Sequence, residues 1–269
     1  MDASLPPRPL ALITGASAGM GACFARTLAA RGYDVALVAR RLDRLEALAD
    51  ELGEAHGTSA LVIPADLSVP DAHLGAMAVL AGRPVDLLIN NAGYSIAARF
   101  TETDWPTQRD NAMTLMMAVI GLTHAVLPEM LARRKGRIIT ISSILALSQG
   151  GAGHTLYGPS KAFVHKFMLT LAAELQGSGV TVTSVLPGST NSEFQTANGT
   201  ADAMAKMPAF LMSSTQQVVD AALAGSDTGK LIVIPGWHNE IMALAFKLMP
   251  DPLTRWLSAR ATATFKTPS

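Results

Sequence analysis

Seven short runs rich in valine, isoleucine and leucine recur along the chain without alternating polar residues. They are residues 10–14, 34–39, 60–64, 86–90, 137–141, 180–186 and 231–234. Such runs are typical of strands that are covered on both faces, as in a parallel sheet. Segments with helical spacing, such as residues 42–52, lie between them. The alternation predicts an α/β fold: a doubly wound, mostly parallel seven-stranded sheet with helices on both faces.

Composition narrows the class of protein. The chain has 269 residues, 49% of them hydrophobic, and 21 basic residues balance 21 acidic ones. This balance argues against binding of nucleic acid or anionic lipid through bulk charge, and favours small molecules or further copies of the chain as partners. The single cysteine, Cys23, cannot form an internal disulfide. No signal peptide is evident, and the most apolar stretch, residues 112–122, is too short to span a bilayer. We expect a cytoplasmic protein without a transmembrane segment or a metal site.

Two segments depart from the alternation. Residues 189–214 form an unusually long connection with several apolar side chains, which is typical of a lid over a ligand site. Residues 237–266 have the pattern of two short amphipathic helices separated by prolines, and we expect them to pack on the chain or to contact a second subunit rather than a membrane. We found no domain boundary, so residues 1–269 are expected to form a single domain that includes both segments.

A glycine-rich turn follows the first predicted strand. The residues Thr14-Gly15-Ala16-Ser17-Ala18-Gly19-Met20-Gly21 lead directly into an apolar helix. Glycines at such a turn allow backbone N–H groups to approach a pyrophosphate closely, and the helix N-terminus favours its negative charge. At the first strand-to-helix turn of a doubly wound sheet, the pattern predicts a dinucleotide site.

The residues after the next strands indicate which dinucleotide binds. Arg40 and Arg41 stand where an NAD-binding fold places a carboxylate for the ribose hydroxyls, and a guanidinium suits a 2′-phosphate instead. NADP is therefore favoured over NAD. Asp66 and Leu67 follow the third strand, where a carboxylate can accept from the adenine amino group. Asn91, Ala92 and Gly93 end the fourth strand at the edge where ligands bind.

A third motif carries acid–base chemistry. Ser142 and Ser143 end the fifth predicted strand, and Tyr157 lies four residues before Lys161 on one helical face. A cation near a phenol stabilises the phenolate, so we expect Lys161 to lower the pKa of Tyr157 and make it a usable general acid and base.

Taken together, these motifs resemble the short-chain dehydrogenases/reductases, non-extended branch, over about residues 9–234. The resemblance implies a Rossmann fold and a homodimer or homotetramer in which residues 112–122 lie at an interface; cover by the chain's own tail is the alternative. It implies that Tyr157 protonates a substrate carbonyl, that Ser143 hydrogen-bonds its oxygen, and that Lys161 binds the nicotinamide ribose. Tyr157 and Lys161 thus belong to the cofactor site as well. Asn111 would hold a water that resupplies the proton, and Pro187, Gly188 and Thr190 would flank the nicotinamide carboxamide.

The sequence also departs from the family pattern. The spacing from Ser143 to Tyr157 is one residue longer than usual, Ser192 replaces a common threonine, and Ala18 replaces a base found in many NADP-binding members. NADP selection would then rest on Arg40 and Arg41. The leading hypothesis is an NADPH-dependent reductase of an apolar ketone or aldehyde, similar to the subgroup of broad ketone and ketoacyl reductases. The alternatives are a catalytically silent dinucleotide-binding sensor or scaffold, and a sugar-nucleotide epimerase or dehydratase, which needs a different glycine spacing.

Overall fold

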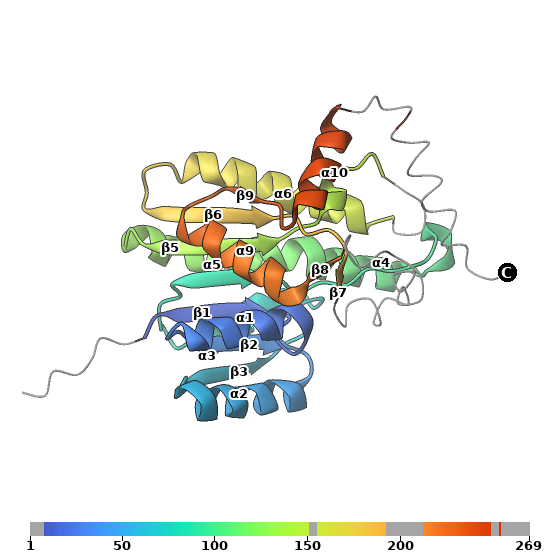
Figure 1. Ribbon diagram of the computed structural model, residues 1–269. Helices are drawn as coiled ribbons and strands as arrows, with labels where there is room; N and C mark the ends of the chain where they lie inside the picture. Colours follow the sequence, from blue (N-terminus) through green and yellow to red (C-terminus); the bar gives the residue numbers. More distant parts are fainter. Residues whose placement is uncertain (1–7, 151–154, 192–211, 249–252, 254–269) are drawn as a thin grey trace, which may run out of the picture.

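Seven parallel strands form one sheet in the order β3-β2-β1-β4-β5-β6-β9 (Figure 1). The computed structural model describes residues 8–150, 155–191, 212–248 and 253. The strands are β1 (Leu10–Thr14), β2 (Asp34–Ala39), β3 (Ala60–Pro64), β4 (Leu87–Asn90), β5 (Gly136–Ile141), β6 (Val180–Val185) and β9 (Ile232–Val233). The order reverses between β1 and β4, so the predicted doubly wound parallel sheet is confirmed.

No strand limit differs from the prediction by more than one residue. β4 begins at Leu87, although the Asp86 N–H donates to the Leu10 carbonyl at 2.9 Å and the Asp86 carbonyl accepts from the Arg137 N–H at 3.0 Å. The Asp86 carboxylate accepts from the Leu10 N–H at 3.0 Å and pairs with Arg133 at 2.9 Å. β6 ends before Leu186, although the N–H of Leu186 still donates to Val233. At both ends the interstrand hydrogen bonds continue one residue past the assigned strand.

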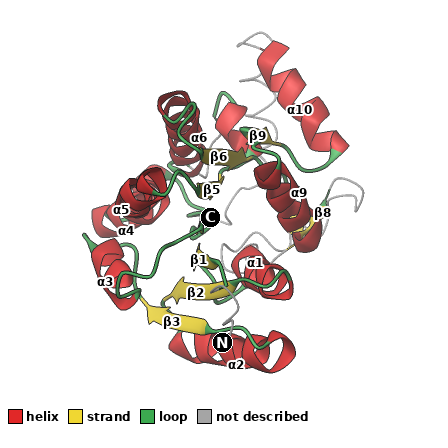
Figure 2. Cartoon of the chain, turned by 90° about the vertical axis from the view of Figure 1, so that its left-hand side faces the viewer, coloured by secondary structure: helices red, strands yellow, loops and turns green. Residues whose placement is uncertain are grey.

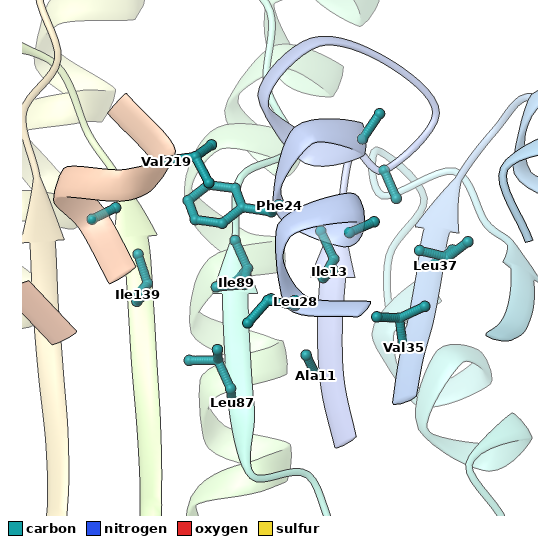
Figure 3. Close-up of a cluster of buried hydrophobic side chains, with 14 of the residues drawn as sticks. Ala11, Ile13, Phe24, Leu28, Val35, Leu37, Leu87, Ile89, Ile139 and Val219 are labelled. Carbon is teal, nitrogen blue, oxygen red and sulfur yellow. The ribbon is translucent and has the colours of Figure 1, made fainter. Parts of the chain in front are cut away.

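Helices cover both faces of the sheet, as Figure 2 shows in the end-on view. α1 (Gly19–Ala30), α2 (Leu42–His56) and α9 (Thr215–Asp227) pack on one face. α3 (Ala72–Val79), α5 (Ala118–Ala132) and α6 (Tyr157–Glu174) pack on the other. In Figure 3, Phe24 and Leu28 of α1 lie over Ile13 and Ile89, and Phe24 is fully buried. Two apolar layers therefore enclose the sheet, as its purely apolar strands require.

The predicted apolar helix over residues 112–122 lies inside a longer helical stretch. α4 (Trp105–Ala112) continues through a π-helical turn, Met113–Met117, into α5. Leu115, Val119 and Leu122 are buried, whereas Met117 is 50% exposed. By length and composition alone, the stretch Trp105–Ala132 is long and apolar enough to cross a membrane. This is weak evidence for a membrane span, because core helices of soluble proteins pass the same test.

The two irregular segments are described only in part. β7 (Thr190–Asn191) and β8 (Ser213–Ser214) pair in parallel and join the two ends of the predicted lid, whose residues 192–211, including Ser192, lie outside the described residues. The first predicted tail helix is α10 (Trp237–Leu248), which packs on the 3-10 turn Ile144–Leu147. The second tail helix and its prolines fall almost wholly outside the described residues.

α10 packs on the chain through only part of its surface. Three of its apolar side chains are exposed, Trp237 by 66%, Ile241 by 59% and Leu244 by 55%, so contact with a second subunit, the other role expected for this segment, stays a prediction. The buried face instead carries Asn239 and Ala243, whose small size allows the helix to approach the strand ends closely. Within the described residues, α10 packs on the 3-10 turn rather than on α5, so it does not supply the alternative cover for residues 112–122.

Candidate active site

The candidate site lies along the carboxyl ends of the strands, at the point where the strand order reverses. Thr14 ends β1, and Asn91 follows the neighbouring strand β4. The Thr14 hydroxyl donates to the Ile89 carbonyl at 3.2 Å and accepts from the backbone N–H groups of Asn91 at 2.9 Å and Ala92 at 3.0 Å. The Asn91 side-chain amide donates to the Thr14 carbonyl at 2.8 Å. These bonds hold the two strand ends together at the crevice where open α/β sheets bind their ligands.

Two glycines of the motif between β1 and α1, Gly15 and Gly21, leave no room for a Cβ. Gly15 has φ +67°, and a Cβ there would lie 2.8 Å from the Asn91 side-chain nitrogen. A Cβ on Gly21 would clash with the carbonyl group of Gly15. α1 begins with Ala18 as its N-cap and has neither a side-chain cap nor an acidic residue in its first turn. This turn of closely packed backbone fits a pyrophosphate: Gly15 and Gly21 have no room for a Cβ, and Gly19 has φ +52°. The pyrophosphate role of these glycines stays a prediction.

Two arginines lie beside this cradle. Arg41 donates to the Ser17 hydroxyl from Nε at 3.2 Å and from Nη2 at 2.9 Å, which joins the start of α2 to the glycine turn. Arg40 is exposed, and its charge reaches the carboxylate of Asp66. The structure thus brings together both predicted arginines, Ser17 and Asp66. Two guanidinium groups beside a glycine cradle fit an additional phosphate on the adenosine ribose.

Three other predicted cofactor residues have definite positions. The Asp66 carboxylate accepts from both the backbone N–H and the hydroxyl of Ser68, at 2.9 and 2.7 Å. Although partial burial raises the pKa of Asp66, these hydrogen bonds and Arg40 lower it overall. Leu67 is buried in the core, so only its backbone can face a ligand, and Met20 packs against the core around α1.

Ser143, Tyr157 and Lys161 come together at the ends of β5 and α6. The Ser143 side chain hydrogen-bonds the Tyr157 side chain. The ammonium group of Lys161 lies 5.6 Å from the centre of the Tyr157 ring. The Ser142 hydroxyl instead donates to the backbone carbonyl of Lys161 at 2.7 Å, which turns it away from Tyr157. Ser143, rather than Ser142, is therefore the serine beside the tyrosine.

The expected pKa change of Tyr157 is wrong in direction. Burial of the hydroxyl raises the pKa of Tyr157 to about 12, although the hydrogen bond to Ser143 opposes the rise. Burial also lowers the pKa of Lys161 to about 8. Loss of water around both groups is a larger effect here than the attraction between a cation and a phenolate from which the lower pKa was expected.

The Lys161 ammonium has contacts besides the one with the Tyr157 ring. Its side chain is 5% exposed, and Nζ donates to the Ile141 carbonyl at 2.7 Å. A Cβ on Gly93 would lie 3.6 Å from Nζ and clash with the Leu115 side chain, so Gly93 is needed for close packing around the ammonium. Gly93 thus supports the catalytic side as well as the predicted cofactor site.

Asn111 is the penultimate residue of α4. It is 1% exposed, and its Nδ2 donates at 3.0 Å to the carbonyl of Tyr94, in the loop that follows β4. The π-helical turn begins two residues later, and the Thr114 hydroxyl donates to the Asp110 carbonyl there. A π-turn changes the direction of the side chains around it, and such turns are frequent at functional sites.

The turn after β6 is tied to the serine loop. The Pro187 carbonyl accepts from the Ile144 N–H at 2.9 Å, directly after Ser143. The Thr190 hydroxyl donates to the Gly188 carbonyl at 3.1 Å. Of the three residues predicted to flank the carboxamide, Pro187 is thus bonded to the loop that carries the predicted catalytic serine, and Thr190 is bonded to Gly188.

Sequence reasoning missed the structural part played by two residues at this edge. Thr14 was read only as part of the glycine motif, yet its hydroxyl joins β1 to β4. Asn239 was not singled out, although it is 1% exposed and packs against Gly188. Its polarity gave no signal, because His238, Glu240 and Lys247 are polar residues of the same helix.

The chain is similar in sequence to a known family and to several of its members. Residues 9–203 match the family model of the short chain dehydrogenases. The chain is 34% identical over 245 residues to an uncharacterized oxidoreductase of Myxococcus xanthus, covering 90% of this chain and 93% of that protein. It is 39% identical over 183 residues to the NADP-dependent 3-hydroxy acid dehydrogenase YdfG of Salmonella typhi, covering 66% and 71%.

Two solved structures are also similar. A short-chain dehydrogenase from Sphingobium yanoikuyae, in complex with NADPH, has a TM-score of 0.78 and 33% identity, covering 86% of this chain and 89% of that one. The bulky-bulky ketone specific alcohol dehydrogenase from Comamonas testosteroni has a TM-score of 0.76 and 32% identity, covering 90% and 93%.

Proposed function

Because the chain belongs to the short-chain dehydrogenase family, we propose that it reduces bulky, largely apolar ketones or aldehydes with NADPH and oxidises the corresponding alcohols in reverse. At the coarser level it is an NAD(P)-dependent oxidoreductase, and NADP(H) is its preferred dinucleotide. The observation that carries the proposal is the grouping of Ser143, Tyr157 and Lys161 at the same edge of the sheet as the glycine cradle.

The residues that would hold the dinucleotide follow from their places at the strand ends. The glycine turn with Ser17 and Met20 holds the pyrophosphate, Arg40 and Arg41 hold the 2′-phosphate, and Asp66 and Leu67 lie at the adenine. Further along the edge are the residues for the nicotinamide and its ribose: Asn91, Ala92, Gly93, Tyr157, Lys161, Pro187, Gly188 and Thr190. When bound, the dinucleotide supplies the hydride.

The protein's own residues manage the proton and the charge. The Tyr157 hydroxyl donates its proton to the substrate oxygen, and the Ser143 hydroxyl hydrogen-bonds the same oxygen. The raised pKa of Tyr157 keeps its proton in place at neutral pH, and the Lys161 ammonium stabilises the phenolate that remains after transfer. Asn111, held at the end of α4, positions a water that returns the proton.

The substrate class is inferred from the side chains around Ser143 and Tyr157. Directly after Ser143 come Ile144 and Leu145, of which Leu145 is 40% exposed, and Leu156 directly precedes Tyr157. A carboxylate substrate would need a cation here to replace its lost hydration. The Lys161 ammonium already donates to the Ile141 carbonyl and lies over the Tyr157 ring. It is therefore poorly placed to pair with a substrate carboxylate. These contacts favour an apolar ketone over the hydroxy acids named for YdfG.

We also propose self-association as a homodimer or homotetramer. Met117 on the helical stretch 105–132 is 50% exposed and Leu131 is 38% exposed, and Phe163 on α6 is 44% exposed. Large apolar side chains at the surface are commonly covered by a further subunit. A cytoplasmic location remains a prediction from the sequence.

A substrate panel tests the proposed activity. NADPH consumption is measured with ketones that carry two large apolar groups, with short 3-oxo acids, and with each ketone's alcohol plus NADP⁺. We expect kcat/KM for the bulky ketones to exceed that for the oxo acids by about tenfold or more, since an unpaired buried carboxylate costs several kcal/mol. Higher kcat/KM for the oxo acids would overturn the substrate assignment. Leu145→Arg, which adds a cation beside Ser143, should shift the preference toward the acids, whereas Leu145→Met should not.

A further inference from the structure

α10 reaches the cofactor side of the sheet through one buried polar side chain. Asn239 is 1% exposed, although Trp237 and Ile241 on the same helix are exposed by more than half. A methyl group added to Gly188 would clash first with the Asn239 carboxamide, whose three terminal atoms are its nearest neighbours. Asn239 therefore packs directly on the backbone of Gly188.

The other side of the carboxamide is fixed to the edge strand. Asn239 Nδ2 donates to the Pro235 carbonyl at 2.6 Å, and the Asn239 N–H donates to the Gly236 carbonyl at 3.0 Å. Pro235 follows β9, whose Val233 carbonyl accepts from Leu186 at 2.8 Å. The carboxamide is thus wedged between the ends of β6 and β9, and its position is set by hydrogen bonds rather than by shape alone.

The turn that Asn239 supports also holds the serine loop. The Pro187 carbonyl accepts from Ile144, the residue after Ser143, and α10 packs on the 3-10 turn that begins at Ile144. A shift of Gly188 toward α10 would therefore move both the nicotinamide side of the cofactor site and the Ser143 hydroxyl.

We propose that Asn239 is a positioning residue that fixes the Pro187–Gly188 turn, and through it couples the C-terminal helix α10 to NADPH binding and to the placement of Ser143. The inference rests on the proposed NADPH-dependent activity, but it concerns the fit of the cofactor site rather than the identity of the substrate. Asn239 contacts neither substrate nor cofactor in this role.

The first test measures NADPH binding without turnover. The dissociation constant for NADPH is determined by calorimetry for the wild type, for Asn239→Ala, and for Glu240→Ala as an exposed control on the same helix. We expect Asn239→Ala to raise the dissociation constant by about fivefold or more and to lower kcat as well, because small misplacements at a reacting site have large effects. Glu240→Ala should stay within twofold of the wild type.

The second test uses the contact itself. Gly188→Ala should weaken NADPH binding because its methyl group displaces the Asn239 carboxamide. Combining it with Asn239→Ala removes the three atoms that the methyl group meets first. The double variant should therefore bind NADPH more tightly than the product of the two single losses predicts.

Two outcomes would overturn the proposal. One is that Asn239→Ala lowers the melting temperature but leaves both the dissociation constant for NADPH and kcat unchanged, as a merely structural role requires. The other is strict additivity of the two substitutions. If the ketone panel showed no reduction, the proposed function would fail while the NADPH binding results still decided the role of Asn239.

Discussion

The Lys161 ammonium lies 5.6 Å from the centre of the Tyr157 ring while it donates to the Ile141 carbonyl at 2.7 Å. A cation within about 6 Å of an aromatic ring is attracted to it, and the attraction grows when water is excluded. Both groups are held at the end of β5, and burial moves their pKa values toward the neutral forms, to about 8 for Lys161 and about 12 for Tyr157. The pair is therefore sensitive to alkaline pH through the lysine before the tyrosine.

The pH dependence of ketone reduction should reflect Lys161. Below about pH 8 the amine is charged and stabilises the phenolate left by proton transfer, whereas above it the charge is lost. Tyr157, with a pKa of about 12, keeps its proton throughout this range. We expect kcat/KM for NADPH, which reports the free enzyme, to fall above about pH 8. A profile that stays flat to pH 10 would exclude Lys161 as the controlling group.

The same lysine should destabilise the folded protein at neutral pH. Its pKa falls from 10.5 in the unfolded chain to about 8 in the folded one, so the unfolded state binds more protons between these values and stability rises with pH there. Relative to Lys161→Met, the wild type should gain about 3 kcal/mol in the free energy of unfolding between pH 7 and pH 11. Urea unfolding at both pH values checks this. An unchanged difference between the two proteins would contradict the lowered pKa.

Tyr157→Phe should separate chemistry from binding. The variant keeps the ring beside Lys161 but has no proton to donate, so kcat for ketone reduction should fall by about 10² to 10⁴. The dissociation constant for NADPH should stay within about threefold, because the hydroxyl is only one of many cofactor contacts. Tyr33→Phe is the matched control, since the Tyr33 hydroxyl accepts from Arg137 at the other end of the sheet. Near-normal turnover by Tyr157→Phe would remove Tyr157 from the mechanism.

Exchange of the two arginines should change the cofactor preference. Arg40→Asp combined with Arg41→Leu removes two positive charges and adds a carboxylate that can accept from ribose hydroxyls. The ratio of kcat/KM for NADPH to that for NADH should fall by about tenfold or more, as loss of a charge-assisted hydrogen bond to phosphate costs about 1.5 kcal/mol or more. Arg31→Leu, which removes a charge that pairs with Asp227, should leave the ratio unchanged. An unchanged ratio in the double variant would rule out the phosphate assignment.

Two glycines in helices should respond to alanine in opposite ways. Gly21→Ala places a Cβ against the Gly15 carbonyl, so it should distort the cradle and weaken NADPH binding by about tenfold or more. Gly75→Ala in α3 meets nothing within 4 Å and should stabilise the protein by about 0.5–1 kcal/mol without affecting NADPH. Calorimetric binding and urea unfolding of both variants provide the comparison. Equal NADPH affinity in the two variants would contradict the cradle.

Much of the architecture could be predicted because it depends on local patterns. The apolar runs placed all seven strands to within one residue, since a strand covered on both faces must be apolar throughout. The glycine turn and the spacing from Tyr157 to Lys161 located the candidate site, because backbone clearance and helix periodicity are properties of short segments.

The remaining features depend on residues far apart in the sequence. Burial of Tyr157 and Lys161, which reverses the expected pKa change, comes from the elements that close around them. The choice of Ser143 over Ser142 depends on where the Lys161 carbonyl lies. The contact of Asn239 with Gly188 joins α10 to the turn that follows β6, and no local sequence pattern predicts it. The sequence by itself determined which backbone segments form and which chemistry they carry; only the tertiary structure decided which groups lose their water and which hydroxyl faces which partner, because desolvation and nonlocal hydrogen bonds arise when the elements pack.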